Sequence, residues 1–330
     1  MIISKTPLRI SFAGGGSDFR SFYRDNKYGA VLSTSIASYI YVSVKKQSTL
    51  FSEKYRLNYS ETELIDDLND IKNPIIRECI RFLEIDDQLY ISTIADAPAS
   101  TGLGSSSTFC VGLLNALYKL KGEVVSAGRL AEEAAYIECD ILKRPMGKQD
   151  HYAAAYGGIN YIRFYDDDTV TVRPLNMTSK NLKLFSDSIS VYWTGLIRPS
   201  ESVLKEQDER NKSNKDILTT MKNQALELSK ILTTPELSIK NVGDLLHEGW
   251  ELKKSLASRV SNQSIDNWYT KAIKFGALGG KISGAGGGGF LSLIVDANNQ
   301  VALSNKLEKL GLEKYSFKLD SGGTIVTEIT

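Results

Sequence analysis

The chain has 330 residues, of which 42% are hydrophobic and 24% are charged, and its formal net charge at pH 7 is +1. This length fits two domains, and the composition excludes a mainly disordered chain. The balanced charge excludes a nucleic-acid binder that relies on a basic surface, and the lack of an apolar run of about 18 residues excludes a membrane-spanning helix.

Strand signals dominate the first hundred residues. Runs rich in alternating, β-branched or aromatic residues predict strands at 8–13, 35–44, 51–59 and 89–95. The first strand runs into a glycine-rich turn. A helix is predicted to begin near Asn73, because Pro74 suits a first helical turn and the apolar residues that follow share one face.

Helices and strands mix through the rest of the chain. A Gly/Ser-rich loop at 98–107 is predicted to open a helix that runs through Tyr118. The later predicted elements are a helix at 126–142, a hairpin of 157–164 and 169–174 around an acidic turn, a strand at 188–194, one long helix at 200–232, helices at 242–256 and 265–275, a glycine-rich loop at 279–289, a strand at 290–295, a helix at 300–310 and a last strand pair within 315–329. Without strict βαβ alternation, this order predicts an α+β fold, with a domain boundary within 176–183.

The cysteines and the paired basic residues carry little functional signal. Cys79, Cys110 and Cys139 lie far apart in apolar stretches and form no Cys-x-x-Cys pair, so neither a disulfide framework nor a zinc site is expected. Free thiols suit the reducing cytoplasm, which is the expected location. Paired basic residues such as Lys253-Lys254 are expected on solvated faces.

The loop at 98–108 is the most informative segment of the sequence. It reads Pro-Ala-Ser-Thr-Gly-Leu-Gly-Ser-Ser-Ser-Thr and lies between a predicted strand and a predicted helix. Glycines let backbone amides approach an anion, and the N-terminus of the helix adds free N–H groups and a positive dipole end. Serine hydroxyls can bind phosphate or Mg²⁺, or simply cap the helix. The loop therefore predicts a triphosphate site, although the Walker A pattern is absent.

A second glycine-rich loop lies at 279–289. Its glycines at 284, 286 and 289 match Gly-x-Gly-x-x-Gly, but a helix is predicted before the loop and a strand after it. A dinucleotide-binding fold needs the opposite order, so a dehydrogenase is supported by the loop pattern only. The alternative is a loop that packs closely against another part of the backbone.

Two acidic residues near glycines are candidates for chemistry. Asp18 follows Gly14-Gly15-Gly16 and could accept hydrogen bonds from sugar hydroxyls, or it could cap the next helix. Asp150 follows Gly147 and Lys148. A carboxylate beside a lysine can take a hydroxyl proton, and the lysine can offset charge on a transferring phosphoryl group. The alternative for this segment is a helix cap with a surface ion pair.

Together, the three loops resemble the three motifs of the GHMP kinase family, in the family's order and over nearly the whole chain. Residues 98–108 resemble the phosphate-binding motif, 281–289 the C-terminal glycine motif and 7–18 the N-terminal substrate motif. The resemblance implies an ATP-binding N-terminal domain at 1–178, similar to ribosomal protein S5 domain 2, and a ferredoxin-like C-terminal domain at 179–330. Nucleotide and acceptor would meet in the cleft between them.

The resemblance also implies roles for individual residues. Asp150 would be the catalytic aspartate, with Lys148 and Arg9 as further catalytic residues. Ser106 and Glu138 would ligate Mg²⁺, with Glu133 as the alternative to Glu138. The residues expected to bind ATP are Pro98, Ser100, Thr101, Gly102, Leu103, Gly104, Ser105, Ser106 and Ser107. The residues expected to bind the substrate are Gly15, Gly16, Ser17, Asp18, Arg198, Gly284, Ala285 and Gly286.

Within this family, residues 9–19 and 147–150 look most like the D-glycero-D-manno-heptose 7-phosphate kinases. Such an enzyme phosphorylates the anomeric C1 hydroxyl, giving the 1,7-bisphosphate on the way to a nucleotide-activated heptose. The branch often has Gln after the catalytic aspartate, whereas His151 stands here. Arg198 is the candidate for binding the 7-phosphate, because a guanidinium favours bidentate phosphate contacts.

The resemblance implies a small-molecule sugar phosphate as partner, with no nucleic acid and no membrane, and a homodimer is compatible with it. One alternative keeps the family and changes the acceptor to another sugar or sugar phosphate, as in a fucokinase. A second alternative is a non-catalytic protein that senses ATP or a sugar on the same fold. The presence of Ser106, an acidic Mg²⁺ candidate and Asp150 argues against it, because a binder needs no base.

Overall fold

The structure is a computed structural model that describes residues 1–197 and 199–329. Its first half contains β1 (Ile2–Ala13), α1 (Arg20–Tyr23), β2 (Tyr28–Lys46), β3 (Tyr55–Asn58), β4 (Thr62–Ile65), α2 (Pro74–Phe82), β5 (Leu89–Ala95), α3 (Ser105–Leu120), α4 (Ala127–Ala135), α5 (Gln149–Tyr156), β6 (Ile159–Tyr165) and β7 (Val170–Pro174). The second half contains α6 (Ser179–Ser188), β8 (Ile189–Trp193), α7 (Ser200–Arg210), α8 (Lys215–Thr233), α9 (Ile239–Lys254), α10 (Gln263–Lys274), β9 (Ala277–Ile282), β10 (Phe290–Val295), α11 (Gln300–Glu308), β11 (Glu313–Tyr315) and β12 (Ile325–Glu328). The α+β prediction is confirmed.

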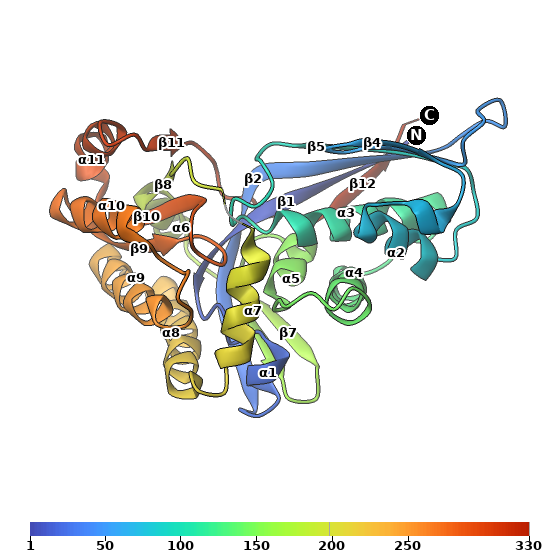
Figure 1. Ribbon diagram of the computed structural model, residues 1–330. Coiled ribbons are helices and arrows are strands. Elements are labelled where there is room, and N and C mark those ends of the chain that lie inside the picture. The colour runs from blue at the N-terminus through green and yellow to red at the C-terminus, as the bar shows by residue number, and fades with distance from the viewer. Residues whose placement is uncertain (198, 330) are drawn as a thin grey trace.

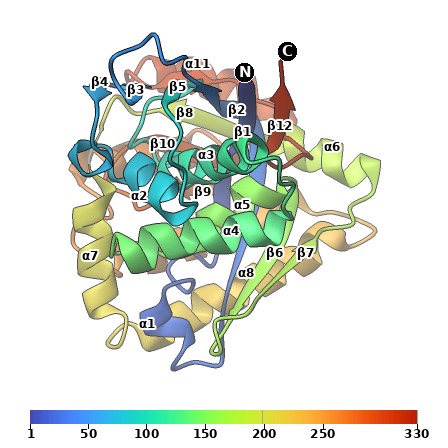
Figure 2. The same ribbon diagram turned by 90° about the vertical axis from the view of Figure 1, so that its right-hand side faces the viewer.

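The larger sheet has the strand order β12-β1-β2-β5-β3-β4, and β6 joins it by pairing with β2 and β7. The long strand β2 makes this possible, because its first part pairs with β6 and its last part pairs with β5. Helices α2, α3, α4 and α5 gather on one side of this sheet (Figures 1 and 2). Helix α3 is buried along most of its length and packs on β1 and β2, so its N-terminus is held firmly beside β1.

The smaller sheet has the order β11-β8-β10-β9, and all its pairings are antiparallel. In chain order this is the arrangement 4-1-3-2 of a ferredoxin-like domain, which confirms the fold expected for the second half. Helices α7 to α10 all lie between β8 and β9, and α11 lies between β10 and β11. A second hydrophobic core, which includes Trp250, Ile282 and Leu293, forms between these helices and the sheet.

The prediction of one helix at 200–232 is wrong, because α7 ends at Arg210 and α8 begins at Lys215. Two asparagine side chains stabilise the break between them. Asn211 donates to Oγ of Ser21, and Asn214 donates to the carbonyl of Leu256. The predicted apolar stripe of the helix is confirmed in α8, where the residues of the stripe are buried, namely Leu218, Met221, Ala225, Leu228 and Leu232.

Three other expectations need correction. The last two strands do not pair with each other: β11 joins the smaller sheet and β12 pairs with β1, so the two chain ends lie side by side (Figure 2). The glycine-rich segment at 279–289 begins as a strand, β9, rather than as a loop. The helix expected at 126–142 ends at Ala135 and continues as a wider π-helical turn at 136–141.

The sequence also left some features unassigned or untested. Helix α6 and strand β4 were not predicted, and the domain boundary at 178/179 stays a prediction. No helix in residues 1–197 and 199–329 has the length and apolarity that a membrane span needs.

Candidate active site

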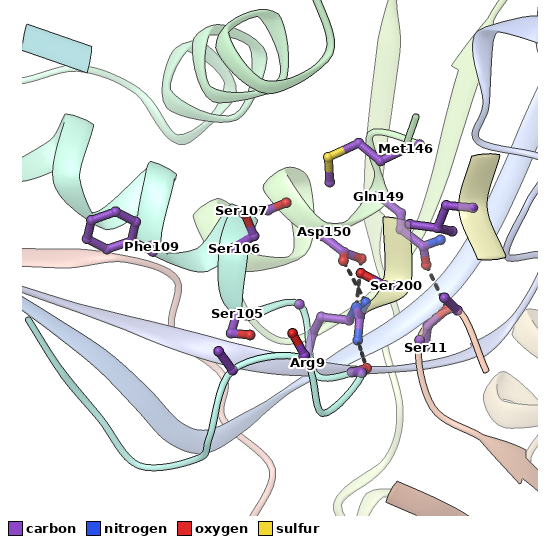
Figure 3. Close-up of a pocket in the computed structure, with 18 of the residues that line it drawn as sticks. Arg9, Ser11, Ser105, Ser106, Ser107, Phe109, Met146, Gln149, Asp150 and Ser200 are labelled. Carbon is purple, nitrogen blue, oxygen red and sulfur yellow. Dashed lines mark hydrogen bonds and ion pairs between the residues drawn. The ribbon is translucent and has the colours of Figure 1, made fainter. Parts of the chain in front are cut away.

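A cavity of about 780 Å³ lies where the three glycine-rich segments meet. Its walls come from β1, the turn after β1, the loop before α3 and the start of α5 on one side, and from α7, α9 and the segment that follows β9 on the other. Figure 3 shows this cavity with Asp150, Arg9 and the three serines that open α3. The fold therefore brings together the three segments whose motifs the sequence resembles.

Arg9 and Asp150 form a bidentate ion pair at the centre of the cavity (Figure 3). Nε of Arg9 lies 2.7 Å from Oδ1 of Asp150, and Nη2 lies 2.6 Å from Oδ2. The third guanidinium nitrogen, Nη1, donates to the carbonyl of Gly102 at 2.5 Å. Arg9 therefore ties together β1, the first turn of α5 and the loop before α3, and it fixes the orientation of the Asp150 carboxylate.

Asp18 is almost fully buried beside Gln149, the residue that precedes Asp150. Its carboxylate accepts hydrogen bonds from the backbone of Gly16 at 2.9 Å and from both the backbone and the side chain of Gln149, at 3.2 and 3.1 Å. Oε1 of Gln149 in turn accepts from Oγ of Ser11 at 2.7 Å. Burial, above all, and the charge of Asp150 raise the pKa of Asp18, although the hydrogen bonds from Gly16 and Gln149 act in the opposite direction.

The alternative that Asp18 caps a helix is wrong, because α1 has Phe19 at its N-cap and no side-chain capping bond. Gly147 leaves room for the carboxylate instead. A Cβ atom at position 147 would lie 1.9 Å from Oδ2 of Asp18, so only glycine fits there.

The loop before α3 presents its backbone to the cavity. Gly104 stands at the N-cap of α3 with a φ of 81°, and no side chain caps the helix, so the first amides of α3 stay free for a ligand. Of the residues expected to bind ATP, seven line the cavity, namely Pro98, Ser100, Gly102, Gly104, Ser105, Ser106 and Ser107. Thr101 and Leu103 do not: both are fully buried, and the Leu103 carbonyl accepts from the backbone N–H of Arg9.

Ser106 and Glu138 lie together at the edge of this loop. Oγ of Ser106 is 2.6 Å from Oε1 of Glu138, which the wider helical turn at 136–141 places in a fully buried position. Oε2 of Glu138 is 2.9 Å from Nε2 of His151, and Nη1 of Arg144 lies 2.5 Å from Oε1 and 2.6 Å from the serine oxygen. Burial alone would raise the pKa of Glu138, but His151, Arg144 and Ser106 outweigh it and lower the pKa to about 2.

Glu133, the alternative acidic residue, lies elsewhere. Its carboxylate contacts the hydroxyl of Tyr118 at 2.6 Å and Nε of Arg129 at 2.8 Å. Throughout the described residues, no group of three or more His, Cys, Asp and Glu side chains is arranged to hold a metal ion. A cation at Ser106 and Glu138 would therefore need further ligands from a bound phosphate.

Family models match the two halves of the chain and decide its family. The model of the GHMP kinases N terminal domain matches residues 73–158, and the model of the GHMP kinases C terminal domain matches residues 233–312, together about half of the chain. The chain belongs to the GHMP kinase family. It is accordingly an ATP-dependent kinase that phosphorylates an alcohol group.

Similar proteins extend the match over the full length of this GHMP kinase. The D-glycero-alpha-D-manno-heptose 7-phosphate kinase of Campylobacter jejuni is 29% identical over 322 residues, which cover 93% of each chain. The galactokinase of Pyrococcus furiosus is 25% identical and covers 96% of this chain and 95% of its own. The crystal structure of a D-glycero-D-manno-heptose 1-phosphate kinase from Bacteroides thetaiotaomicron superposes with a TM-score of 0.82 at 26% identity, covering both chains fully. The galactokinase of Lactococcus lactis shares the fold, with a TM-score of 0.76 at 18% identity.

Lys148 lies away from the cavity of the GHMP kinase, contrary to expectation. Its Nζ atom lies 3.4 Å from Oδ1 of Asp168, in the turn between β6 and β7, where Asp168 also binds Arg24 and Tyr23. Two other lysines, Lys253 and Lys281, line the cavity near Asp150. Lys253 was expected on a solvated face, but it is buried, and only its neighbour Lys254 is paired at the surface, with Glu251 at 2.9 Å.

The remaining expected substrate residues divide into two groups. Gly15, Gly16, Asp18, Gly284 and Ala285 line the cavity. Ser17 and Gly286 do not: the Ser17 hydroxyl donates to backbone carbonyls of Gly14 and Ala30, and Gly286 packs against Val260. Arg198 lies outside the described residues. Gly284 also packs directly on Gly102, so the segment after β9 makes the close backbone contact that the sequence allowed as an alternative.

Four residues of the site were not singled out from the sequence, namely Arg144, Gln149, Lys253 and Lys281. Gln149 and Lys281 stand within motif segments, and that position was their only signal. The spacing of the apolar residues of α9 was a signal for Lys253, because the helical period places it on the buried face with Leu246 and Trp250.

Proposed function

We propose that this kinase transfers the terminal phosphoryl group of ATP to the anomeric C1 hydroxyl of D-glycero-D-manno-heptose 7-phosphate, which gives the 1,7-bisphosphate used in nucleotide-activated heptose biosynthesis. The full-length similarity to the Campylobacter jejuni enzyme supports this acceptor. The similarity to the Bacteroides thetaiotaomicron structure also supports a heptose phosphate, although that protein's name gives the phosphate at position 1 rather than 7.

The observation that carries the proposal is the position of the Arg9–Asp150 pair, between the amide-lined loop before α3 and the buried carboxylate of Asp18. An ionised carboxylate has about four lone-pair sites, and Arg9 occupies only two of those on Asp150. Asp150 therefore keeps the capacity to accept a hydroxyl proton from an acceptor in the cavity. In the proposed step, Asp150 takes the C1 proton as the hydroxyl oxygen bonds to the γ-phosphorus and ADP leaves.

The acceptor side of the proposed site consists of hydrogen-bonding groups on rigid segments. Asp18 and Gln149 form one connected network with Ser11, and Gly15 and Gly16 line the same cavity, with the Gly16 amide donating to Asp18. Such groups suit a ligand with several hydroxyls, because each of them can accept or donate without moving. We assign the sugar ring to this wall and the triphosphate to the free amides of α3.

Ser106 and Glu138 fit a magnesium ion that accompanies ATP. Both offer oxygen ligands 2.6 Å apart, and the pKa of Glu138 near 2 keeps its carboxylate ionised. When bound there, Mg²⁺ would neutralise charge on the phosphate oxygens. Arg144 contacts the same two oxygen atoms, so its guanidinium supplies the positive charge that this pair of residues favours.

The proposed location is the cytoplasm, where ATP is available and where the free thiols of Cys79, Cys110 and Cys139 stay reduced. A homodimer stays a prediction, which light scattering after size-exclusion chromatography would test.

The test is an assay with ATP and a panel of acceptors, followed by NMR of the product. We expect turnover with D-glycero-D-manno-heptose 7-phosphate and a new phosphorus–carbon coupling at C1. Turnover restricted to galactose, fucose or another sugar would reject heptose 7-phosphate as the acceptor but retain the assignment as a sugar kinase. Binding of ATP and sugar without any turnover would support a sensor instead.

A further inference from the structure

Two lysines from the second half of the chain reach into the cavity, and among residues 1–197 and 199–329 neither has a carboxylate partner. Lys253 lies in the last turn of α9, and Lys281 lies on β9, where it is paired in register with Ser292. The two residues are 5% and 6% exposed, and both line the cavity that holds Arg9 and Asp150. They lie close enough to each other that the charge of Lys281 lowers the pKa of Lys253.

The charges of the cavity do not balance around these lysines. Arg9 is matched by Asp150, to which it donates two hydrogen bonds, and the buried Asp18, which also lines the cavity, acts on both lysines only from beyond 4.0 Å. Within the described part of the chain, no carboxylate oxygen lies within 4.0 Å of either lysine nitrogen. Lys253 donates to the carbonyl of Gly284, and no protein group among the described residues accepts from Lys281. Two buried ammonium groups therefore face the cavity with their donors largely unused.

This arrangement lowers the stability of the folded protein when no ligand is bound. A buried charge is tolerated when it is paired, and two like charges in one cavity add to the cost. Burial lowers the pKa of both lysines, to about 8 for Lys281 and well below the usual value for Lys253. An anion in the cavity would supply the missing counter-charge and would accept from both groups.

The position of Lys253 and Lys281 in the cavity indicates which kind of anion they would bind. Gly284, which accepts from Lys253, packs on Gly102, and the carbonyl of Gly102 accepts from Arg9. The lysines therefore stand beside the loop before α3 and beside the Asp150 carboxylate. A tetrahedral oxyanion can accept from two separate ammonium groups, which act as point charges, so it matches this pair better than a flat carboxylate does.

We propose that Lys253 and Lys281 together form a subsite for a phosphoryl group bound in the cavity. The inference rests on the proposed function for its two sources, which are the terminal phosphate of ATP and the phosphate that the acceptor sugar already carries. The chemistry of recognition is the same for both, so binding measurements must separate them.

The test uses the variants Lys253→Met and Lys281→Met, since methionine keeps much of the side-chain length and removes the charge. Lys254→Met is the matched control, because Lys254 is the neighbouring residue and pairs with Glu251 outside the cavity. Calorimetry would measure the affinity of each protein for two ligand pairs. The first pair is adenylyl imidodiphosphate and ADP, and the second pair is heptose 7-phosphate and heptose.

We expect each variant to lose about 10- to 100-fold in affinity for the member of at least one pair that carries the additional phosphoryl group, namely adenylyl imidodiphosphate or heptose 7-phosphate, the range for charge-assisted hydrogen bonds. The other member of that pair should bind as it does to the wild type. Loss within the first pair assigns the subsite to the nucleotide, and loss within the second pair assigns it to the acceptor. Unchanged affinities in both variants overturn the proposal. A wild-type protein that binds adenylyl imidodiphosphate no better than ADP, and heptose 7-phosphate no better than heptose, also overturns it.

Binding is measured without turnover, so the outcome separates this inference from the proposed function. A wild-type protein that binds heptose 7-phosphate through the two lysines but never phosphorylates it would contradict the proposed reaction. The same result would still support the phosphoryl subsite. Unfolding temperatures of all three variants show that any loss of affinity is not a loss of folded protein.

Discussion

Arg9 and Asp150 lie 141 residues apart in the sequence, and their side chains meet through two hydrogen bonds of 2.7 and 2.6 Å. The pair joins the first strand of the larger sheet to the first turn of α5. Because the carboxylate is fixed from both oxygens, its remaining lone pairs point in directions that the fold determines. This relationship is the reason to test Asp150 first.

The variant Asp150→Asn should lower kcat by about 10²- to 10⁴-fold, the usual range for a missing general base. Nucleotide affinity should change little, because the amides of the loop before α3 remain in place. Steady-state kinetics and calorimetry with an ATP analogue measure the two effects. Asp87→Asn is a suitable control, since Asp87 pairs with Lys46 at the surface. Turnover within a few-fold of the wild type would remove Asp150 from the proposed mechanism.

Glu138 and Glu133 offer a direct comparison of the two acidic candidates. The variant Glu138→Gln removes the charge 2.6 Å from the hydroxyl of Ser106, whereas Glu133→Gln alters only the contacts with Tyr118 and Arg129. We expect the first variant to raise the half-maximal Mg²⁺ concentration at least tenfold and the second to leave it unchanged. Titration of activity with Mg²⁺ at saturating ATP makes the measurement.

A separate readout guards against a purely structural effect of the Glu138 substitution. Equilibrium binding of Mn²⁺ in the presence of an ATP analogue should weaken in Glu138→Gln and not in Glu133→Gln. Equal metal affinity in both variants would contradict the assignment of Glu138.

The sequence predicts local structure well where the signal is local. Asn73 caps α2 ahead of Pro74, the strand at 89–95 has the predicted limits, and the loop at 98–107 leads into α3 as expected. The resemblance of the three loops gave the family because each motif lies within one short segment of the chain.

The errors arise where a distant contact decides the structure. The helix at 200–232 is broken because Asn211 binds Ser21, which lies 190 residues away. The lysine pair at 253–254 is an error of another kind, because the helical period already places Lys253 on the buried face of α9 and leaves Lys254 half-buried beside Glu251. Lys148 stands beside Asp150 in the sequence, yet its side chain turns to Asp168. Proximity in sequence was therefore a poor guide to which cations surround the carboxylate.

Arg144 contacts the two oxygen atoms that would also ligate a divalent cation, so the two positive charges would compete. Its Nη1 atom lies 2.6 Å from Oγ of Ser106 and 2.5 Å from Oε1 of Glu138. The variant Arg144→Met removes this competing charge, so we expect the half-maximal Mg²⁺ concentration to fall by about 2- to 10-fold, as for the loss of one partly exposed ion pair. Arg129→Met, which breaks an ion pair with Glu133, is the control. A rise in the Mg²⁺ requirement would mean that Arg144 orients the two oxygen ligands rather than competing for them.

Lys281 links the charge of the cavity to the stability of the protein. Burial, above all, and the positive charge of Arg9 lower its pKa from the ordinary value of 10.5 to about 8, although Asp18 and Asp150 act in the opposite direction. Below pH 8 the lysine is charged in both states, and the folded protein bears the full cost of burying it beside Lys253. Between pH 8 and about 10.5 the unfolded chain binds more protons than the folded protein, so this cost decreases as the pH rises.

The variant Lys281→Met should therefore unfold at a higher temperature than the wild type, with the largest gain below pH 8 and a smaller gain as the pH approaches 10. Calorimetric melting curves from pH 6 to 10, without ligand, measure the difference, and Lys254→Met, at a half-buried lysine outside the cavity that pairs with Glu251, serves as the control. A gain that does not change with pH would point to better packing of methionine rather than to a buried charge. Ligand at one fixed concentration should reduce or reverse this gain at pH 7, because the protein that still carries the lysine binds the phosphoryl group more tightly and is stabilised more by it.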